Sequence, residues 1–284
     1  SFLKGVRGKL FFKKVFPEYH MLKLFDSHAH YDDERFEEEF PGGTRGALET
    51  VYNEGICGVL NVGANLDSSA NSVRLAAQFA HVWAAVGVHP SDAQRLGMDR
   101  LDEAIGTIRT LAAQPKVVSV GEIGLDYHYD EIDKDCQAAY FSAQMELARE
   151  LKLPVIIHTR DAMGDTLDLL ARYPDVTGVM HSYSGSAEVA RQLCDKGWYI
   201  SFSGPVTYKN AAKVKEAAAI VPENRILVET DSPYLPPVPH RGKMNYSGYM
   251  HYTLEAVADI RKKTPEDMAA ITVANTCRLF GITL

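Results

Sequence analysis

Eight short apolar runs recur along the chain, and amphipathic stretches separate them. The runs are nearly continuously apolar rather than alternating, which is typical of strands buried on both faces of a parallel sheet. They span residues 22–25, 56–62, 82–88, 117–120, 155–157, 177–180, 198–202 and 226–228. Eight such units without a break in composition favour a closed α/β fold, the (β/α)8 TIM barrel, over an open doubly wound sheet.

The stretches between the runs carry helix signals. Residues 135–151 repeat apolar side chains every three or four positions, which marks one face of an amphipathic helix. Ser186 is placed to cap a later helix. Thr264, Pro265 and the acidic residues that follow predict an additional C-terminal helix that runs to about Phe280.

A chain of 284 residues can form one such barrel. We expect it over residues 21–284, with residues 1–20 as an N-terminal extension, because Met21 directly precedes the first apolar run and the extension lacks the features of a secretory signal. No apolar run approaches the length that crosses a bilayer, so we expect no membrane association. Four scattered cysteines fit a reducing compartment, and the expected location is the cytoplasm.

The net charge of −7 argues against a broad nucleic-acid-binding surface, because nonspecific affinity for phosphate rests on clustered lysine and arginine. A polyanionic substrate would need a local positive site. The sequence also lacks the glycine motifs of dinucleotide-binding and P-loop proteins and the nucleophile elbow of serine hydrolases.

Six metal-capable side chains close five of the apolar runs. His28 and His30 end the first run, and their two-residue spacing directs both imidazoles to one side of a strand. The full set is His28, His30, Glu122, His158, His181 and Asp231. In a barrel these strand ends lie on the one face where active sites are built.

Four imidazoles and two carboxylates suit two divalent cations better than one. Zn²⁺ and Mn²⁺ fit this donor set, whereas Mg²⁺ ordinarily takes more oxygen ligands, so the identity among Mg²⁺, Mn²⁺ and Zn²⁺ stays open. Two cations with two ionised carboxylates carry a formal charge of about +2, from +4 and −2, which supplies the local attraction for phosphate.

Residues 21–284 resemble the TatD-like metal-dependent deoxyribonucleases of the amidohydrolase superfamily. The resemblance rests on Asp-Ser-His-Ala-His at 26–30, Val-Gly-Val-His-Pro at 86–90, Gly-Glu-Ile-Gly-Leu-Asp-Tyr at 121–127, Ile-His at 157–158, His-Ser-Tyr-Ser-Gly at 181–185, Glu-Thr-Asp-Ser-Pro-Tyr-Leu at 229–235 and Pro-His-Arg-Gly-Lys at 239–243. It implies that one cation is held by His28, His30, Glu122 and Asp231, and the second by Glu122, His158 and His181. Glu122 would then bridge the two.

The activity that the resemblance implies is two-metal phosphodiester hydrolysis in DNA, trimming a single strand from its end. The chain departs from the family pattern at 181–183 and 244–247, which leaves substrate preference open. The same metals could instead cleave a small ester, lactone or amide, or an aminoacyl ester on tRNA. A noncatalytic binding protein is a third reading, but it has no evident need for all six ligands.

Individual roles follow from these positions. We expect Glu122 and Asp231 to be catalytic, Asp231 by orienting or deprotonating the attacking water, although it could be a purely structural ligand. His89 lies outside the six-ligand set and would contact a phosphate oxygen, donate a proton to the leaving group, or simply sit at the rim. Asp126 would orient a ligating imidazole or stabilise a turn.

The expected substrate-binding residues are His89, Arg160, His240 and Arg241, with Arg241 ranked first among the loop cations.

Overall fold

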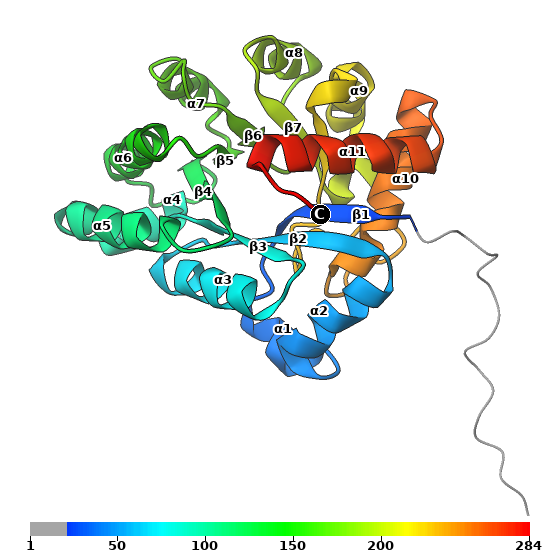
Figure 1. Cartoon of the computed structure of the whole chain (residues 1–284). Helices are drawn as coiled ribbons and strands as arrows, with labels where there is room; N and C mark the ends of the chain where they lie inside the picture. Colours follow the sequence, from blue (N-terminus) through cyan, green and yellow to red (C-terminus); the bar gives the residue numbers. More distant parts are fainter. Residues whose placement is uncertain (1–21) are drawn as a thin grey trace, which may run out of the picture.

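The computed structural model describes residues 22–284, in which strands and helices alternate around one sheet (Figure 1). The expected extension, residues 1–20, lies outside the described residues. The strands are β1 (Leu24–Ala29), β2 (Ile56–Val62), β3 (Val82–Val86), β4 (Val117–Asp126), β5 (Val155–Arg160), β6 (Gly178–Met180), β7 (Tyr199–Phe202) and β8 (Ile226–Val228).

The helices surround the sheet as an outer layer (Figure 1). They are α1 (Glu34–Glu39), α2 (Gly43–Asn53), α3 (Leu66–Gln78), α4 (Pro90–Leu96), α5 (Leu101–Ala112), α6 (Lys134–Leu151), α7 (Met163–Leu170), α8 (Ala187–Asp195), α9 (Ala212–Ile220), α10 (Met250–Arg261) and α11 (Pro265–Phe280). Within residues 22–284, no helix combines the length and apolar character needed to span a membrane.

Each strand lies parallel to the next in the order β1 to β8. The two outer strands meet at their carboxyl ends, where the Asp231 amide donates to the His28 carbonyl at 2.9 Å and the His30 amide donates to Ser232 at 2.7 Å. These bonds bring the sheet round on itself. The expected TIM barrel with an additional C-terminal helix is therefore confirmed.

The barrel interior is an apolar cluster that draws a buried side chain from nearly every strand, including Phe25, Leu60 and Ile156. Leu279, Phe280 and Ile282, at the end of α11 and beyond it, pack into the same cluster. Figure 1 shows α11 lying across this end of the barrel. The C-terminal segment thus closes the end of the barrel at which the strands begin. The end at which the strands finish, their carboxyl ends, stays open for a site.

Two of the expected helix starts are confirmed at the level of the cap. The Ser186 side chain accepts a hydrogen bond from the Val189 amide at the start of α8, and Thr264 accepts one from the Asp267 amide at the start of α11. The helix expected over residues 135–151 is α6.

Three strands run further than the apolar runs predict. β1 continues to Ala29, β4 to Asp126 and β5 to Arg160. Glu122 and His158 therefore lie within strands rather than after them, whereas His28 lies near the end of β1 as expected. The pairing of β4 with β5 continues through Ile123 to Asp126. The predicted runs stop at the first polar side chains. The strands continue past them because the backbone hydrogen bonds between strands do not depend on side-chain polarity, and these polar side chains face a polar cavity.

We predict that Phe280→Ala destabilises the barrel by about 3–5 kcal/mol, because it removes a buried aromatic ring from the closed end. Urea denaturation followed by circular dichroism measures this change. Leu284→Ala is the matched control, since Leu284 is 57% exposed, and it should change stability by less than about 0.5 kcal/mol. Equal stability of the two variants would show that α11 does not close the barrel.

Candidate metal centre

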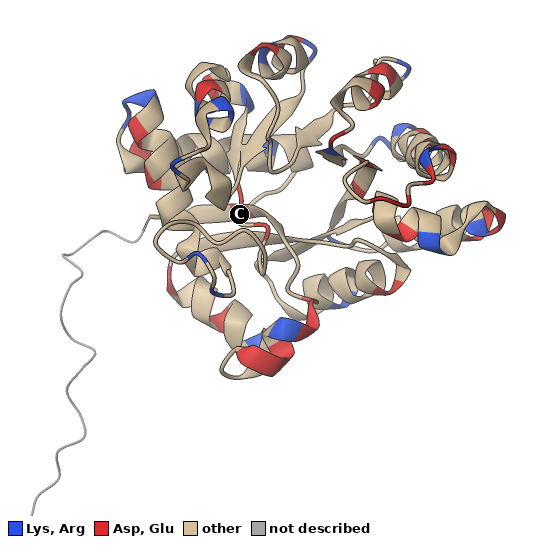
Figure 2. Ribbon diagram, turned by 180° about the vertical axis from the view of Figure 1, so that it is seen from behind, with Lys and Arg blue, Asp and Glu red and all other residues tan. Residues whose placement is uncertain are grey.

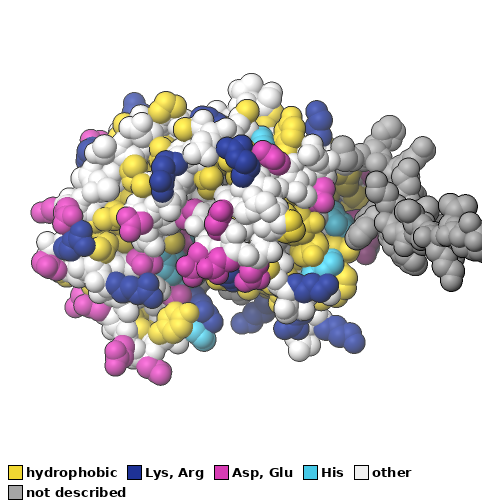
Figure 3. Space-filling model, turned by 90° about the horizontal axis from the view of Figure 1, so that it is seen from below, with side chains coloured by type: hydrophobic (Ala, Val, Ile, Leu, Met, Phe, Trp, Pro, Cys, Tyr) yellow, Lys and Arg dark blue, Asp and Glu magenta, His cyan; other side chains and the backbone are white. Residues whose placement is uncertain are grey.

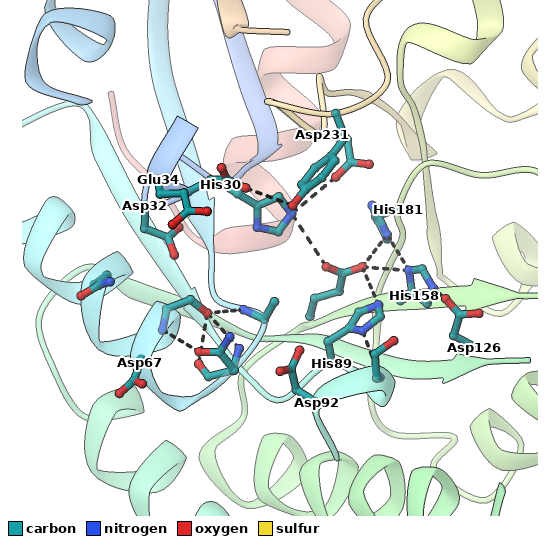
Figure 4. A pocket seen from close by; sticks show the side chains of 18 of the residues that line it. His30, Asp32, Glu34, Asp67, His89, Asp92, Asp126, His158, His181 and Asp231 are labelled. Carbon is teal, nitrogen blue, oxygen red and sulfur yellow. Dashed lines mark hydrogen bonds and ion pairs between the residues drawn. The ribbon is translucent and has the colours of Figure 1, made fainter. Parts of the chain in front are cut away.

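The strand pattern directs the candidate ligands into the mouth of the barrel. Ile156 and Val179 belong to the interior cluster, and His158 and His181 follow each of them by two residues. Side chains two positions apart point to the same side of a strand, so both imidazoles point inward at the carboxyl ends. Figure 4 shows them converging with His30 and Asp231.

Glu122 on β4 lies at the centre of the six residues, and its two carboxylate oxygens face different partners. Glu122 Oε1 lies 2.9 Å from His158 Nδ1 and 2.7 Å from His181 Nε2. Glu122 Oε2 lies 3.6 Å from His28 Nε2 and 3.9 Å from His30 Nε2. The carboxylate therefore divides the four histidines into two pairs.

Asp231 completes the pair formed by His28 and His30. Its Oδ1 lies 3.4 Å from His30 Nε2 and 3.7 Å from His28 Nε2. Asp231 has φ of 58°, in the left-handed region that aspartate tolerates better than most residues. Asp231 lies three residues after the end of β8, and its amide also bonds to His28 on β1.

In the neutral form, which is the form that ligates a metal, three of the imidazoles present a lone pair to the centre, because the other ring nitrogen then donates a hydrogen bond. His30 Nδ1 donates to the Val62 carbonyl at 2.7 Å, His158 Nε2 to Asp126 at 3.0 Å and His181 Nδ1 to Glu229 at 3.2 Å. A carbonyl or carboxylate can only accept, so the nitrogen facing Glu122 is unprotonated in the neutral ring. Histidines that ligate metals are usually supported in this way.

The surroundings of the site favour positive charge at its centre. Burial raises the pKa of Glu122, but the charge of protonated His181 and the hydrogen bonds that protonated His158 and His181 donate outweigh it and hold this pKa well below its ordinary value. Burial likewise opposes ionisation of Asp231, yet His30 keeps its pKa lowered. Burial lowers the pKa of His30, whereas Asp231 raises it to about 9.

This donor set fits divalent cations. It offers two ionised carboxylates and imidazole nitrogens that face one another, with His28 Nε2 only 3.1 Å from His30 Nε2. Two such nitrogens at this distance need a proton or a cation between or beside them. Donor atoms of His28, His30 and Glu122 lie within 4.8 Å of one another, and so do those of Glu122, His158 and His181.

His89 lies beside the centre in a different arrangement. Its Nδ1 accepts a hydrogen bond from the Ser91 amide at 3.2 Å at the start of α4, which places the proton of the neutral ring on Nε2. Nε2 lies 3.9 Å from Glu122. Burial and the neighbouring His158 lower the pKa of His89 to about 3, so the ring is a neutral donor. It suits hydrogen bonding to a substrate better than metal ligation.

The carboxyl-terminal face holds a cavity of about 820 Å³ lined by five of the six candidate ligands, with His28 buried beneath. A second cavity of about 410 Å³ adjoins it between the ends of β5 to β8. Arg160 lines both. His240 and Arg241 line neither: His240 stacks on Tyr249, and Arg241 covers Tyr208 beside a smaller surface pocket.

The charges around these cavities are mixed. Asp32, Asp33, Glu34, Asp67 and Asp92 line the larger cavity on the side of β1 to β3. Basic and acidic residues alternate over the helices in Figure 2 and are interspersed on the face drawn in Figure 3. Neither view shows a continuous basic surface, in keeping with the net charge.

Sequence reasoning gave no role to Glu229, although it is fully buried and contacts a candidate ligand. Its Oε1 accepts from the Ser182 amide at 2.8 Å and from His181. A carboxylate directly after the apolar run of β8 was the available signal, because such a group needs a buried partner. For Asp126, the bond to His158 favours the orienting role, while its bond to the His128 amide also fits the turn.

Comparison with known proteins relates the whole barrel to one group of hydrolases. The family model described as "TatD related DNase" matches residues 25–281. A metal-dependent hydrolase of Bacillus subtilis is 40% identical over 91% of this chain and 99% of its own length. A protein of Citrobacter rodentium named 3'-5' ssDNA/RNA exonuclease is 34% identical over 82% of this chain and 90% of its own.

The fold comparison agrees. The crystal structure of a TatD homologue from Escherichia coli superposes with a TM-score of 0.84 at 26% identity, covering 93% of this chain and all of that one. These relatives make the chain a metal-dependent hydrolase that acts on ester bonds.

We predict that Asp126→Asn and Glu229→Gln each weaken metal affinity about 10- to 100-fold, because each loses the carboxylate that orients a histidine. Competition against a chromophoric chelator measures the affinity. Asp161→Asn is the matched control: Asp161 also bonds to a histidine, His128, but at an exposed position. Unchanged affinity in both test variants would remove the orienting role.

Proposed function

This chain belongs to the TatD-related DNase family, and from that premise we propose that it is a deoxyribonuclease that removes nucleotides from the end of single-stranded DNA. We further propose that the catalytic domain spans residues 21–284 and that the site binds two divalent cations. The observation that carries the two-cation proposal is the division of the histidines between the two oxygens of Glu122.

In this proposal one cation is held by His28, His30, Glu122 and Asp231, and the other by Glu122, His158 and His181. Held by these residues, two divalent cations would supply Lewis-acid chemistry, that is, a lowered pKa of a water molecule and compensation of charge on the scissile phosphate and leaving oxygen. The choice among Mg²⁺, Mn²⁺ and Zn²⁺ depends on site geometry, ligand type and metal availability rather than on raw affinity.

Asp231 is the proposed base. Within residues 22–284, its ion pairs to His28 and His30 involve only Oδ1, which leaves Oδ2 able to accept a proton from the attacking water. Because its pKa is lowered, the Asp231 carboxyl group is ionised at neutral pH and has no proton of its own when it meets the water.

His89 and Arg160 are the proposed substrate contacts nearest to the reaction. His89 carries its proton on Nε2, the nitrogen that faces Glu122, so it can donate to a phosphate or leaving oxygen. Arg160 lines both cavities, and among the described residues no ion pair neutralises it. His240 and Arg241 lie outside these cavities and would contact a longer strand at more distant phosphates.

The single-strand proposal is supported by the recessed site and by the name of the Citrobacter relative. His28 is completely buried and Glu122 is 4% exposed, so a phosphate must enter the barrel mouth to reach them. A strand end can enter such a recess more readily than a stiff duplex. Parallel assays on single- and double-stranded DNA, RNA, small esters and aminoacyl-tRNA distinguish this substrate from the alternatives.

We predict that chelation stops DNA cleavage and that added Mg²⁺ or Mn²⁺ restores it.

Asp231→Asn should lower kcat at least about 100-fold while it changes DNA affinity much less, because it removes the proposed base but leaves other substrate contacts in place. Single-turnover kinetics and binding to a hydrolysis-resistant oligonucleotide measure the two effects. Full turnover by metal-verified Asp231→Asn protein would exclude Asp231 as the base.

A further inference from the structure

Two exposed tyrosines stand at the mouth of the metal-facing cavity, and each is associated with an arginine. Tyr234 is 46% exposed and Tyr129 is 59% exposed, and both line this cavity. The Arg35 guanidinium lies 4.3 Å from the centre of the Tyr234 ring, and that of Arg160 lies 5.8 Å from the centre of the Tyr129 ring. Both arginines line the same cavity.

The Tyr234 pair is held in a fixed orientation. Asp33 accepts two hydrogen bonds from the Arg35 guanidinium, each at 2.9 Å, and one from the Tyr234 hydroxyl at 3.0 Å. Arg35 is therefore neutralised by Asp33, and its flat face supports one side of the ring. His30 meets the ring edge-on, with ring centres 6.1 Å apart, and Tyr234 lines both cavities.

The Tyr129 pair lies in the loop after β4 and at the end of β5. Tyr129 also meets His128 edge-on, with ring centres 5.4 Å apart. Arg160, in contrast to Arg35, has no ion pair within residues 22–284, so it can contact a phosphate while Tyr129 contacts a base.

Strand order places the two pairs on opposite sides of the mouth. Tyr234 and Arg35 follow β8 and β1, which are neighbours across the barrel closure, whereas Tyr129 follows β4 and Arg160 ends β5. In an eight-stranded barrel these two positions face one another, with the candidate ligands between them.

We propose that Tyr234 and Tyr129 are stacking platforms for unpaired bases on the two sides of the scissile phosphate, so that the site selects single-stranded nucleic acid by its base faces. This inference rests on the proposed nuclease function. Each ring offers a flat apolar surface that any base can cover, whereas paired bases in a duplex are stacked on one another and present only their edges.

The charges of the wall near Tyr234 agree with a base rather than a phosphate at that position. Asp32, Glu34 and Asp67 line the same side of the cavity and would repel a phosphate there. A neutral base avoids this repulsion. The backbone phosphates would then lie toward the candidate metal centre and Arg160.

The test compares two hydrolysis-resistant oligonucleotides with equal numbers of phosphates, one of thymidines and one of abasic sites, bound to the metal-loaded enzyme. Tyr234→Ala and Tyr129→Ala should each weaken thymidine binding by about 5- to 150-fold, the equivalent of about 1–3 kcal/mol per stacked base, and abasic binding much less. Tyr129→Phe keeps the ring and should bind like the wild type. Tyr52→Ala, which removes a tyrosine that is 56% exposed but lines neither cavity, should change neither affinity.

Equal losses for both oligonucleotides, or no loss for either, would overturn the stacking inference. Hydrolysis of an unmodified strand by the wild type is measured in parallel and tests the proposed function separately. If the wild type binds in a base-dependent manner through these tyrosines but cleaves no strand, the nuclease proposal fails while the stacking inference stands.

Discussion

The contacts of the Glu122 carboxylate organise the whole candidate site. It is buried between four imidazoles, and it is stable as an anion only because those rings surround it. The imidazoles come from β1, from β5 and from the end of β6, and Glu122 on β4 contacts all three groups. These strands are not all neighbours in the sheet, so closure of the barrel is what brings their side chains together. The C-terminal segment closes the opposite end and leaves this face open.

Much of this arrangement could be predicted from the sequence, for identifiable reasons. Parallel strands are buried on both faces and therefore appear as apolar runs, and polar groups at their ends must converge once the barrel closes. His28, Glu122 and Asp231 were identified in this way. The exact strand ends were not, because β4 continues through polar residues as far as Asp126.

Other features depend on contacts between distant segments and could not be inferred from local pattern. Glu229 acts on His181, 48 residues away, and Tyr234 is fixed by Asp33, 201 residues away. His240 and Arg241 carry the right chemistry for phosphate, but the loop that holds them leads away from the cavities. Under the proposed function, a chain with net negative charge would engage a polyanion through local positive charge and base stacking instead of a basic surface.

The most direct test of this account is an anomalous-diffraction map of crystals soaked in Mn²⁺ or Zn²⁺. The account predicts two peaks, one beside each carboxylate oxygen of Glu122, with His28, His30 and Asp231 around the first and His158 and His181 around the second. A single peak at saturating metal, or peaks that Glu122 does not contact, would contradict it.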